Sequence, residues 1–188
     1  MNRAEALTLL NEHTKNVSLL KHMLAVEAAM RAYARKLGHD EEKWGIVGLL
    51  HDFDYERWPD PPDHPLKGAE ILRQHGYPDD VIYAIKSHAD YIKDCPRVHL
   101  MDKALYACDE LCGLITAAAL VRPAGITDLT AASVKKKMKS KGFARTVNRD
   151  DIEHGAADLG VDLTEHMQFC IDAMKPLAQE LELTRGAT

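Results

Sequence analysis

Apolar residues recur three or four positions apart along most of the chain, a spacing typical of amphipathic helices. The predicted helices cover residues 3–12, about 18–37, 41–52, 65–76, 78–88, 100–121, 130–139, 149–159 and 163–183. Runs of alternating β-branched residues are missing, so no strand is expected. The pattern predicts an all-α fold, a helical bundle built as a single domain over residues 1–188.

Capping residues stand at several of the predicted boundaries. Asn16 and Ser18 are N-cap candidates for the second helix, and Gly38 supplies its C-terminal stop. Asp40 is placed to cap the third helix. The segment 53–62 contains three prolines and is expected to be a loop, because proline disrupts regular structure.

The composition excludes several broad classes of protein. Hydrophobic residues make up 46% and charged residues 28% of the 188 positions, which is typical of a globular protein. The formal charge of −5 is opposite to the net positive charge typical of nucleic-acid-binding proteins, so nucleic acid is not an expected partner. The apolar run 111–121 is too short to span a membrane, and no secretory signal is visible. We therefore expect a cytoplasmic protein that does not bind or span a membrane.

Residues 133–149 form a basic stretch with seven lysines and arginines and no acidic residue. Such a stretch is usually a solvated helix face. A cationic rim also attracts an anionic substrate, and Lys137 and Arg149 are the candidates for this role.

A histidine–aspartate pair, His51-Asp52, ends a strongly apolar predicted helix. Burial of such a pair is costly unless it meets a partner, and a divalent metal ion is one such partner. His22 lies in another apolar helix, and Asp109 lies inside the most apolar helix of the chain. Together these side chains would form a nitrogen and oxygen site with open positions, as catalytic metal sites have.

The order His22, His51-Asp52, Asp109 resembles the signature of the HD superfamily of metal-dependent phosphohydrolases. The resemblance covers about residues 17–122, and the predicted helices over about 130–183 would pack on this core. Over nearly the whole chain, the sequence is similar to small bacterial and archaeal HD-domain hydrolases. The resemblance implies an all-α HD-type bundle and one or two divalent ions, for which Mn, Fe, Co, Ni, Zn and Mg are candidates.

Two further histidines, His64 and His88, resemble the additional ligands of the HD branch that binds two ions. In that branch the aspartate of the pair bridges the ions. The resemblance then assigns His22, His51, Asp52 and Asp109 to one ion and Asp52, His64 and His88 to the other. Two such ions would hold a hydroxide and clamp phosphate oxygens.

Other polar residues near these ligands are candidates for catalysis. Asp54 and Glu56 follow the histidine–aspartate pair and could move protons, although solvated loop carboxylates are the more ordinary interpretation. Lys67 stands near a helix start and could contact phosphate. These residues and Asp52 are our catalytic candidates.

The remaining histidines and the cysteines are expected to have no role in the site. His13, His39, His75, His99, His154 and His166 occupy polar or terminal positions and are expected at the surface. The cysteines are Cys95, Cys108, Cys112 and Cys170. They form no Cys-x-x-Cys pair, so we expect reduced thiols and no zinc site.

The function expected from these features is metal-dependent hydrolysis of a phosphoester or phosphoanhydride bond in a small molecule such as a nucleotide. The ligand set is also similar to that of di-iron oxygenases on the same fold. The segment Phe53-Asp54-Tyr55-Glu56 lacks the lysine of the inositol-oxidising branch, which lowers this alternative. A regulatory module that binds metal or nucleotide without turnover is the other alternative. A homodimer through the apolar C-terminal helix is a possible assembly.

Overall fold

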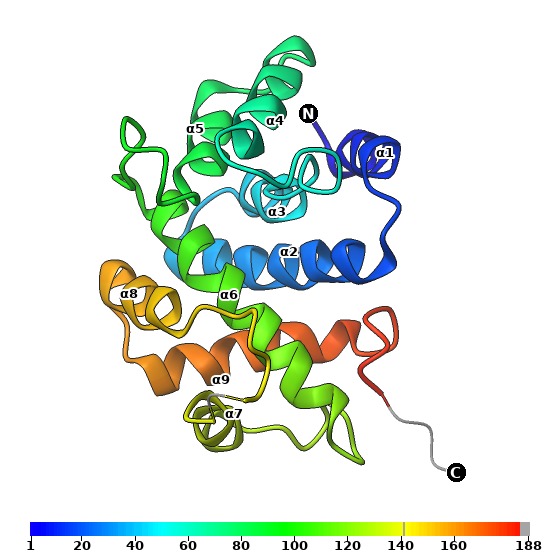
Figure 1. Cartoon of the computed structure of the whole chain (residues 1–188), viewed down its shortest axis with the longest axis vertical. Coiled ribbons are helices and arrows are strands. Elements are labelled where there is room, and N and C mark those ends of the chain that lie inside the picture. Colours follow the sequence, from blue (N-terminus) through cyan, green and yellow to red (C-terminus); the bar gives the residue numbers. More distant parts are fainter. Residues whose placement is uncertain (141, 185–188) are drawn as a thin grey trace. The chain divides into compact units, whose positions relative to one another are not determined.

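A computed structural model describes residues 1–140 and 142–184, and over these residues the secondary structure is helical, without strands. Its α-helices are α1 (Arg3–His13), α2 (Val17–Leu37), α3 (Glu41–Leu50), α4 (Asp63–Gln74), α5 (Asp79–Ser87), α6 (Leu100–Leu120), α7 (Ala131–Met138), α8 (Arg149–Leu159) and α9 (Leu163–Met174) (Figure 1). The prediction of an all-α fold is confirmed. None of the described helices is long and apolar enough to cross a bilayer.

The predicted caps determine where several helices begin and end. The side chain of Asn16 accepts hydrogen bonds from the backbone N–H groups of Ser18 and Leu19, at the start of α2. Gly38 ends α2 with φ of 73°, in the left-handed region that glycine adopts without steric cost. The side chain of Asp40 accepts a hydrogen bond from the N–H of Lys43 at the start of α3.

The predicted helix 163–183 is too long, because α9 ends at Met174. A short 3₁₀ helix, Lys175–Leu177, follows and contains Pro176. Proline has no N–H to donate to the carbonyl oxygen four residues before it, so the α-helical hydrogen bonding stops here, although Lys175 still has helical backbone angles (φ −52°, ψ −43°). The position of Pro176 in the sequence was therefore the signal for this end of the helix.

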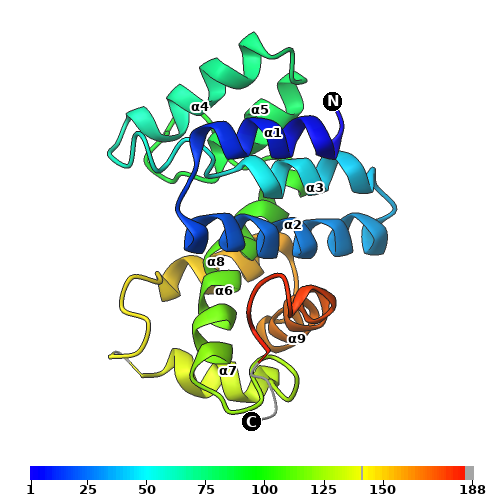
Figure 2. The same ribbon diagram turned by 90° about the vertical axis from the view of Figure 1, so that its right-hand side faces the viewer.

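The chain divides into two compact units, Met1–Tyr106 and Ala107–Thr188. The predicted single domain over 1–188 stays a prediction. In the first unit, α1 and α2 lie on opposite sides of α3 in both views (Figures 1 and 2). The backbones of α2 and α3 approach closely at Gly48, where a Cβ atom would come within 2.9 Å of the Glu27 nitrogen and the Val26 oxygen.

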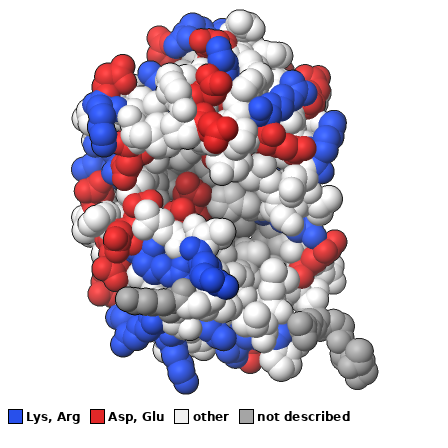
Figure 3. Space-filling model, viewed as in Figure 1, with Lys and Arg blue, Asp and Glu red and all other residues white. Residues whose placement is uncertain are grey.

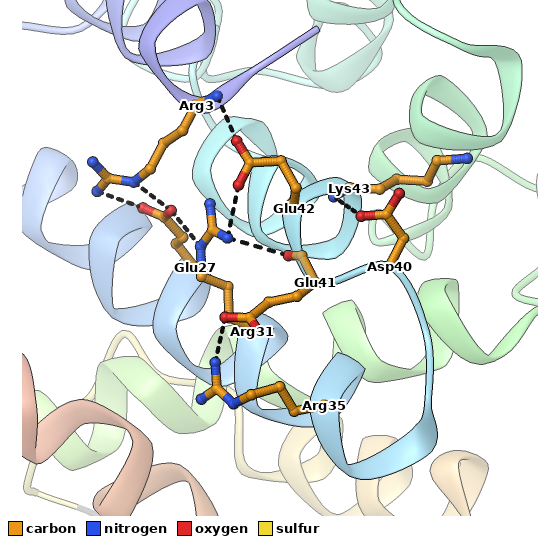
Figure 4. Close-up of polar contacts among 8 residues, drawn as sticks. All are labelled: Arg3, Glu27, Arg31, Arg35, Asp40, Glu41, Glu42 and Lys43. Carbon is orange, nitrogen blue, oxygen red and sulfur yellow. Dashed lines mark hydrogen bonds and ion pairs between the residues drawn. The ribbon is translucent and has the colours of Figure 1, made fainter.

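A network of charged side chains joins α1, α2 and α3 of the first unit (Figure 4). Glu27 on α2 is buried and accepts hydrogen bonds from Arg3 of α1 at 2.6 Å and from Arg31 of its own helix at 2.8 Å. Glu42 on α3 accepts the backbone N–H of Arg3 at 2.8 Å and pairs with Arg31 at 3.0 Å. A buried carboxylate needs such partners, so the network fixes α1 and α2 against α3.

In the second unit, α9 contacts both α7 and α8. The side of α9 that is buried carries His166, Met167, Cys170, Ile171 and Met174. These positions recur with helical spacing, so one continuous stripe of α9 lies in the core of this unit.

Candidate metal centre

Four histidines and an aspartate of the first unit come from four different elements. His22 lies on α2, and His51 is the C-cap of α3, directly followed by Asp52. His88 is the C-cap of α5. His64 lies at the start of α4, where its backbone is extended (φ −79°, ψ 135°) before the regular helix begins. Helix ends therefore place three of the four rings.

The donor atoms converge on the carboxylate of Asp52. Its Oδ1 lies 3.3 Å from Nε2 of His64 and 3.4 Å from Nε2 of His88. Its Oδ2 lies 3.5 Å from Nε2 of His51. The ring of His22 lies edge-on to that of His51, with ring centroids 5.2 Å apart. The two carboxylate oxygens thus face different histidines.

These side chains form two groups that could each hold a metal ion. His22, His51 and Asp52 form one group, and Asp52, His64 and His88 form the other, with the donor atoms of each group within 4.8 Å of one another. Asp52 belongs to both groups. The structure therefore brings together five of the six predicted metal ligands.

Each of three histidines is oriented through its other ring nitrogen. Nδ1 of His51 donates to the carbonyl oxygen of Gly48 at 2.8 Å, and Nδ1 of His88 donates to the carbonyl oxygen of Ile85. Nδ1 of His64 donates to the carboxylate of Asp54 at 2.8 Å. Carbonyl and carboxylate oxygens only accept, so Nδ1 carries the hydrogen and Nε2 faces Asp52. Metal-binding histidines are oriented in this way.

The separations of the donor atoms fit a shared ion. Two nitrogen or oxygen ligands about 2.1 Å from one ion lie roughly 3.0–3.4 Å apart at octahedral or tetrahedral angles. The nitrogens of His64 and His88 are 3.2 Å apart, and both lie 3.3–3.4 Å from Asp52. The residues present therefore fit a divalent cation in donor type and in spacing.

Burial and charge act in opposite directions on these groups. Burial opposes ionisation of Asp52, but His51, His64 and His88 outweigh it and hold the pKa of Asp52 well below its usual range. Burial likewise opposes protonation of His64, but Asp52 and Asp54 outweigh it and raise the pKa of His64 to about 9. The centre is thus a half-buried carboxylate whose negative charge attracts cations.

Asp54 lies behind His64 and is buried. Its Oδ1 accepts from Nδ1 of His64, and its Oδ2 accepts from the backbone N–H of Gly68 on α4 at 2.8 Å. A Cβ atom at Gly68 would come within 2.8 Å of this carboxylate. Both oxygens of Asp54 are therefore engaged in holding His64 and the start of α4.

The other two catalytic candidates from the sequence are exposed to different degrees. Glu56 accepts the backbone N–H groups of Lys15 and Asn16 at 2.7 and 2.8 Å, which lowers the pKa of Glu56. It therefore supports the start of α2, the helix that carries His22. Lys67 on α4 is partly exposed and lies 3.6 Å from Glu70.

The two substrate-binding candidates and the sixth ligand candidate lie in the second unit. Lys137 stands over the ring of Phe143 at 4.7 Å, and Arg149 donates to the carbonyl oxygens of Phe143, Ala144 and Val147. Basic side chains gather in the lower part of Figure 3, where Figure 1 draws α7. Asp109 is half-buried on α6. The roles of these three residues stay predictions.

Two tyrosines lie near His64, in addition to the residues chosen as catalytic, substrate-binding or metal-ligating candidates. The ring of Tyr55 lies edge-on to that of His64 at 5.2 Å. The hydroxyl of Tyr91 donates to the carbonyl oxygen of His64 at 2.6 Å, and burial with the charges of Asp52 and Asp54 raises the pKa of Tyr91 to about 12. Their spacing from the histidines carried no signal, because loop conformation decides which rings meet.

The surface prediction for the other histidines holds for four of them and is wrong for one. His39, His75, His99 and His154 are exposed, and His13 is half-buried. His166 is buried, because it lies on the core-facing stripe of α9. The four cysteines are also buried, and each is a thiol outside any disulfide among the described residues.

Comparisons with known proteins point to one family. A family model described as HD domain matches residues 19–113. The chain is 28% identical over 128 residues to Ribonuclease Y of Oleidesulfovibrio alaskensis, which covers 68% of this chain and 23% of that protein. It is 31% identical over 100 residues to Ribonuclease Y of Desulfotalea psychrophila, which covers 51% of this chain and 18% of the relative. The chain thus spans less than a quarter of the length of these curated relatives. No solved structure matches.

Proposed function

This chain belongs to the HD domain family, and on that premise we propose that it is a metal-dependent hydrolase of phosphoester or phosphoanhydride bonds in a small molecule such as a nucleotide. The observation that carries the proposal is the pair of ligand groups that share Asp52. Three protein ligands for one ion, and four for the other once Asp109 is added, leave positions of a six-coordinate ion for water and for phosphate oxygens.

Asp52 and the histidines around it are proposed to bind the divalent ions. Asp52 is ionised at neutral pH, and its two oxygens face His51 on one side and His64 and His88 on the other. Divalent ions bound there would lower the pKa of a coordinated water towards ~7 and neutralise charge on the transferring phosphoryl group. To hold a cation through Nε2, His64 would have to give up the proton on that nitrogen.

Asp54 and Glu56 act as positioning residues in this proposal. Asp54 fixes the ring of His64 through Nδ1, and Glu56 fixes the backbone at the start of α2. Neither carboxylate needs to touch substrate to have an effect. Lys67 stays our candidate for phosphate contact, since its side chain is partly exposed on the same helix as His64.

The second unit supplies the remaining proposed residues. We keep Asp109 as a further ligand for the ion at His22, His51 and Asp52, as the resemblance implies. Lys137 and Arg149 are proposed to contact the anionic substrate. A pocket of the second unit is lined by three basic residues (Lys139, Arg145 and Arg149) and one acidic residue (Asp150), and this excess of positive charge supports a role in anion binding. The cytoplasmic location and the homodimer stay predictions.

Phosphate release from the metal-stripped protein tests the proposal. Mn, Fe(II), Co and Mg are added in turn with nucleoside mono-, di- and triphosphates, dinucleoside polyphosphates, cyclic dinucleotides and sugar phosphates. We expect metal-dependent release by the wild type that is lost in Asp52→Ala and kept in Asp94→Ala, whose side chain is exposed. Absence of release with every metal and substrate would contradict the proposal.

A second candidate, hydrolysis of phosphodiester bonds in RNA, is favoured by the name of the relatives, Ribonuclease Y. The chain's net charge of −5 argues against it. A single-stranded RNA oligonucleotide in the same assay separates the two substrates. Oxygen consumption by the iron-loaded protein, with no phosphate release, would instead favour the di-iron oxygenase alternative.

A further inference from the structure

A second group of metal-ligating side chains lies in the second unit. Sulfur atoms of Cys108 and Cys170 and a ring nitrogen of His166 lie within 4.8 Å of one another. Cys108, Cys170 and the neighbouring Cys112 are 0% exposed, and His166 is 1% exposed. A polar ring among buried thiols is an unusual core arrangement, because histidine is only of intermediate burial in most proteins.

Helical spacing brings these side chains to one place. Cys108 and Cys112 are four residues apart on α6, and His166 and Cys170 are four residues apart on α9. Residues at this spacing lie on the same face of a helix, one turn apart. Each helix therefore presents a pair of potential ligands to the other.

The ring of His166 is oriented as in a metal site. Its Nε2 donates to the carbonyl oxygen of Ala107 at 2.9 Å, so Nδ1 is the nitrogen without hydrogen. Nδ1 lies 3.7 Å from Sγ of Cys170. Zinc ligands at about 2.3 Å (sulfur) and 2.05 Å (nitrogen) lie roughly 3.6 Å apart at a tetrahedral angle. The observed separation of the two donor atoms matches this value.

The three thiols are linked to one another in the same core. Cys170 makes hydrogen bonds with both Cys108 and Cys112. Burial raises the pKa of Cys108, and hydrogen bonding together with burial raises that of Cys112. In the absence of a metal ion these thiols are therefore protonated, and a bound cation would replace their protons.

We propose that Cys108, His166 and Cys170 bind a zinc ion in the second unit, with Cys112 as the fourth ligand. Thiolates select zinc over the harder ions that suit carboxylate-containing sites. Binding of Zn²⁺ by three thiols and a neutral imidazole releases three protons and leaves a site of net charge −1. Four protein ligands close the site to water, which is typical of a structural zinc ion. The ion would tie α6 to α9 within this unit.

Metal analysis and cobalt substitution test the proposal on the full-length protein. We expect about one zinc ion per chain that resists mild chelation, as in closed structural sites. Protein produced in cobalt-supplemented medium should show thiolate-to-cobalt charge-transfer absorption in the near ultraviolet. The centre at Asp52 has no sulfur ligand among its described side chains, so cobalt bound there gives no such absorption.

Matched variants assign the ligands. Cys170→Ser and His166→Ala should lose the resistant zinc and the charge-transfer band. Cys95→Ser is the control, because Cys95 is a buried thiol of the first unit. Asp52→Ala should also keep the band, which separates this proposal from the hydrolase proposal. If a variant fails to fold, the absorption spectrum of the cobalt-loaded wild type still tests whether thiolates bind the metal. Copper in place of zinc, or cobalt-loaded protein without charge-transfer absorption, would overturn the proposal.

Discussion

The two groups of potential ligands differ in donor type and exposure. The group around Asp52 offers nitrogen and oxygen, and the Asp52 side chain is 16% exposed. The group around Cys170 offers mainly sulfur and is closed to solvent. Catalytic metal sites keep an open coordination position, whereas structural sites have only protein ligands. This difference fits our two proposals, a catalytic centre in the first unit and a structural zinc ion in the second.

The groups also differ in how the fold supports them. Three of the histidines around Asp52 lie at helix ends, and each of these rings is oriented by a carbonyl or carboxylate. The thiols and His166 lie on the faces of two helices. Changes near the first group should thus alter activity, and changes in the second should alter stability.

The largest effect is expected from Asp52→Asn, which removes the carboxylate that both ligand groups share. We expect a loss of phosphate release greater than the about 100-fold typical of residues behind the ligands. Initial rates at saturating manganese measure it. If this variant also lost the thiolate-to-cobalt absorption expected for the second unit, the two ligand groups would not be independent sites.

Asp54→Asn tests the support of His64. An amide replaces the carboxylate oxygens that accept from His64 and Gly68, so the ring is held less firmly. We expect manganese affinity or activity to fall about 10–100-fold. Manganese titration gives the affinity, with Gln74→Ala at the exposed end of α4 as the control. Unchanged affinity and rate would show that Asp54 does not position His64.

Two glycines in helix interiors, one in each unit, should respond differently to substitution by alanine when the unfolding free energy is measured. In Gly48→Ala the new Cβ would meet the α2 backbone at 2.9 Å, so we expect a loss of about 1–3 kcal/mol in unfolding free energy. In Gly113→Ala the nearest atom is a Val147 methyl at 3.8 Å, so we expect a gain of about 0.5–1 kcal/mol. Urea unfolding measures both. A stabilised Gly48→Ala would contradict the close approach of α2 and α3.

The smallest effect is expected in the pH dependence of stability. The backbone N–H of Arg3, together with Arg31, lowers the pKa of Glu42 below its ordinary 4.5. A lowered folded-state pKa contributes stability above about pH 4.5, and this contribution is lost as pH falls through the folded-state value. Glu42→Gln should therefore lower Tm slightly at pH 7, and the difference should vanish at lower pH. A difference that grows in acid would contradict the ion pair.

Sequence reasoning succeeded where the determinants are local. Asn16, Gly38 and Asp40 act within one helical turn, so their caps were visible in the sequence. The end of α9 was missed although Pro176 marks it, because the apolar spacing continues beyond it.

The site was predictable in part for a different reason, the resemblance to the HD signature. The order of the histidines and Asp52 is a sequence pattern, and the structure brings these residues together. The contact between Asp54 and Gly68 depends on the path of a loop and gave no pattern. Burial of His166 could have been inferred from its spacing with Cys170, but which face of α6 meets it could not.

The positions of His51 and His88 as helix C-caps have a consequence beyond orienting two rings. The carboxyl end of a helix carries about half a negative charge from its aligned peptide dipoles. The ends of α3 and α5 therefore add to the field of Asp52 without any further acidic side chain. Through these dipoles, the backbone itself contributes to the selection of cations, so part of this preference should survive many changes of side chain.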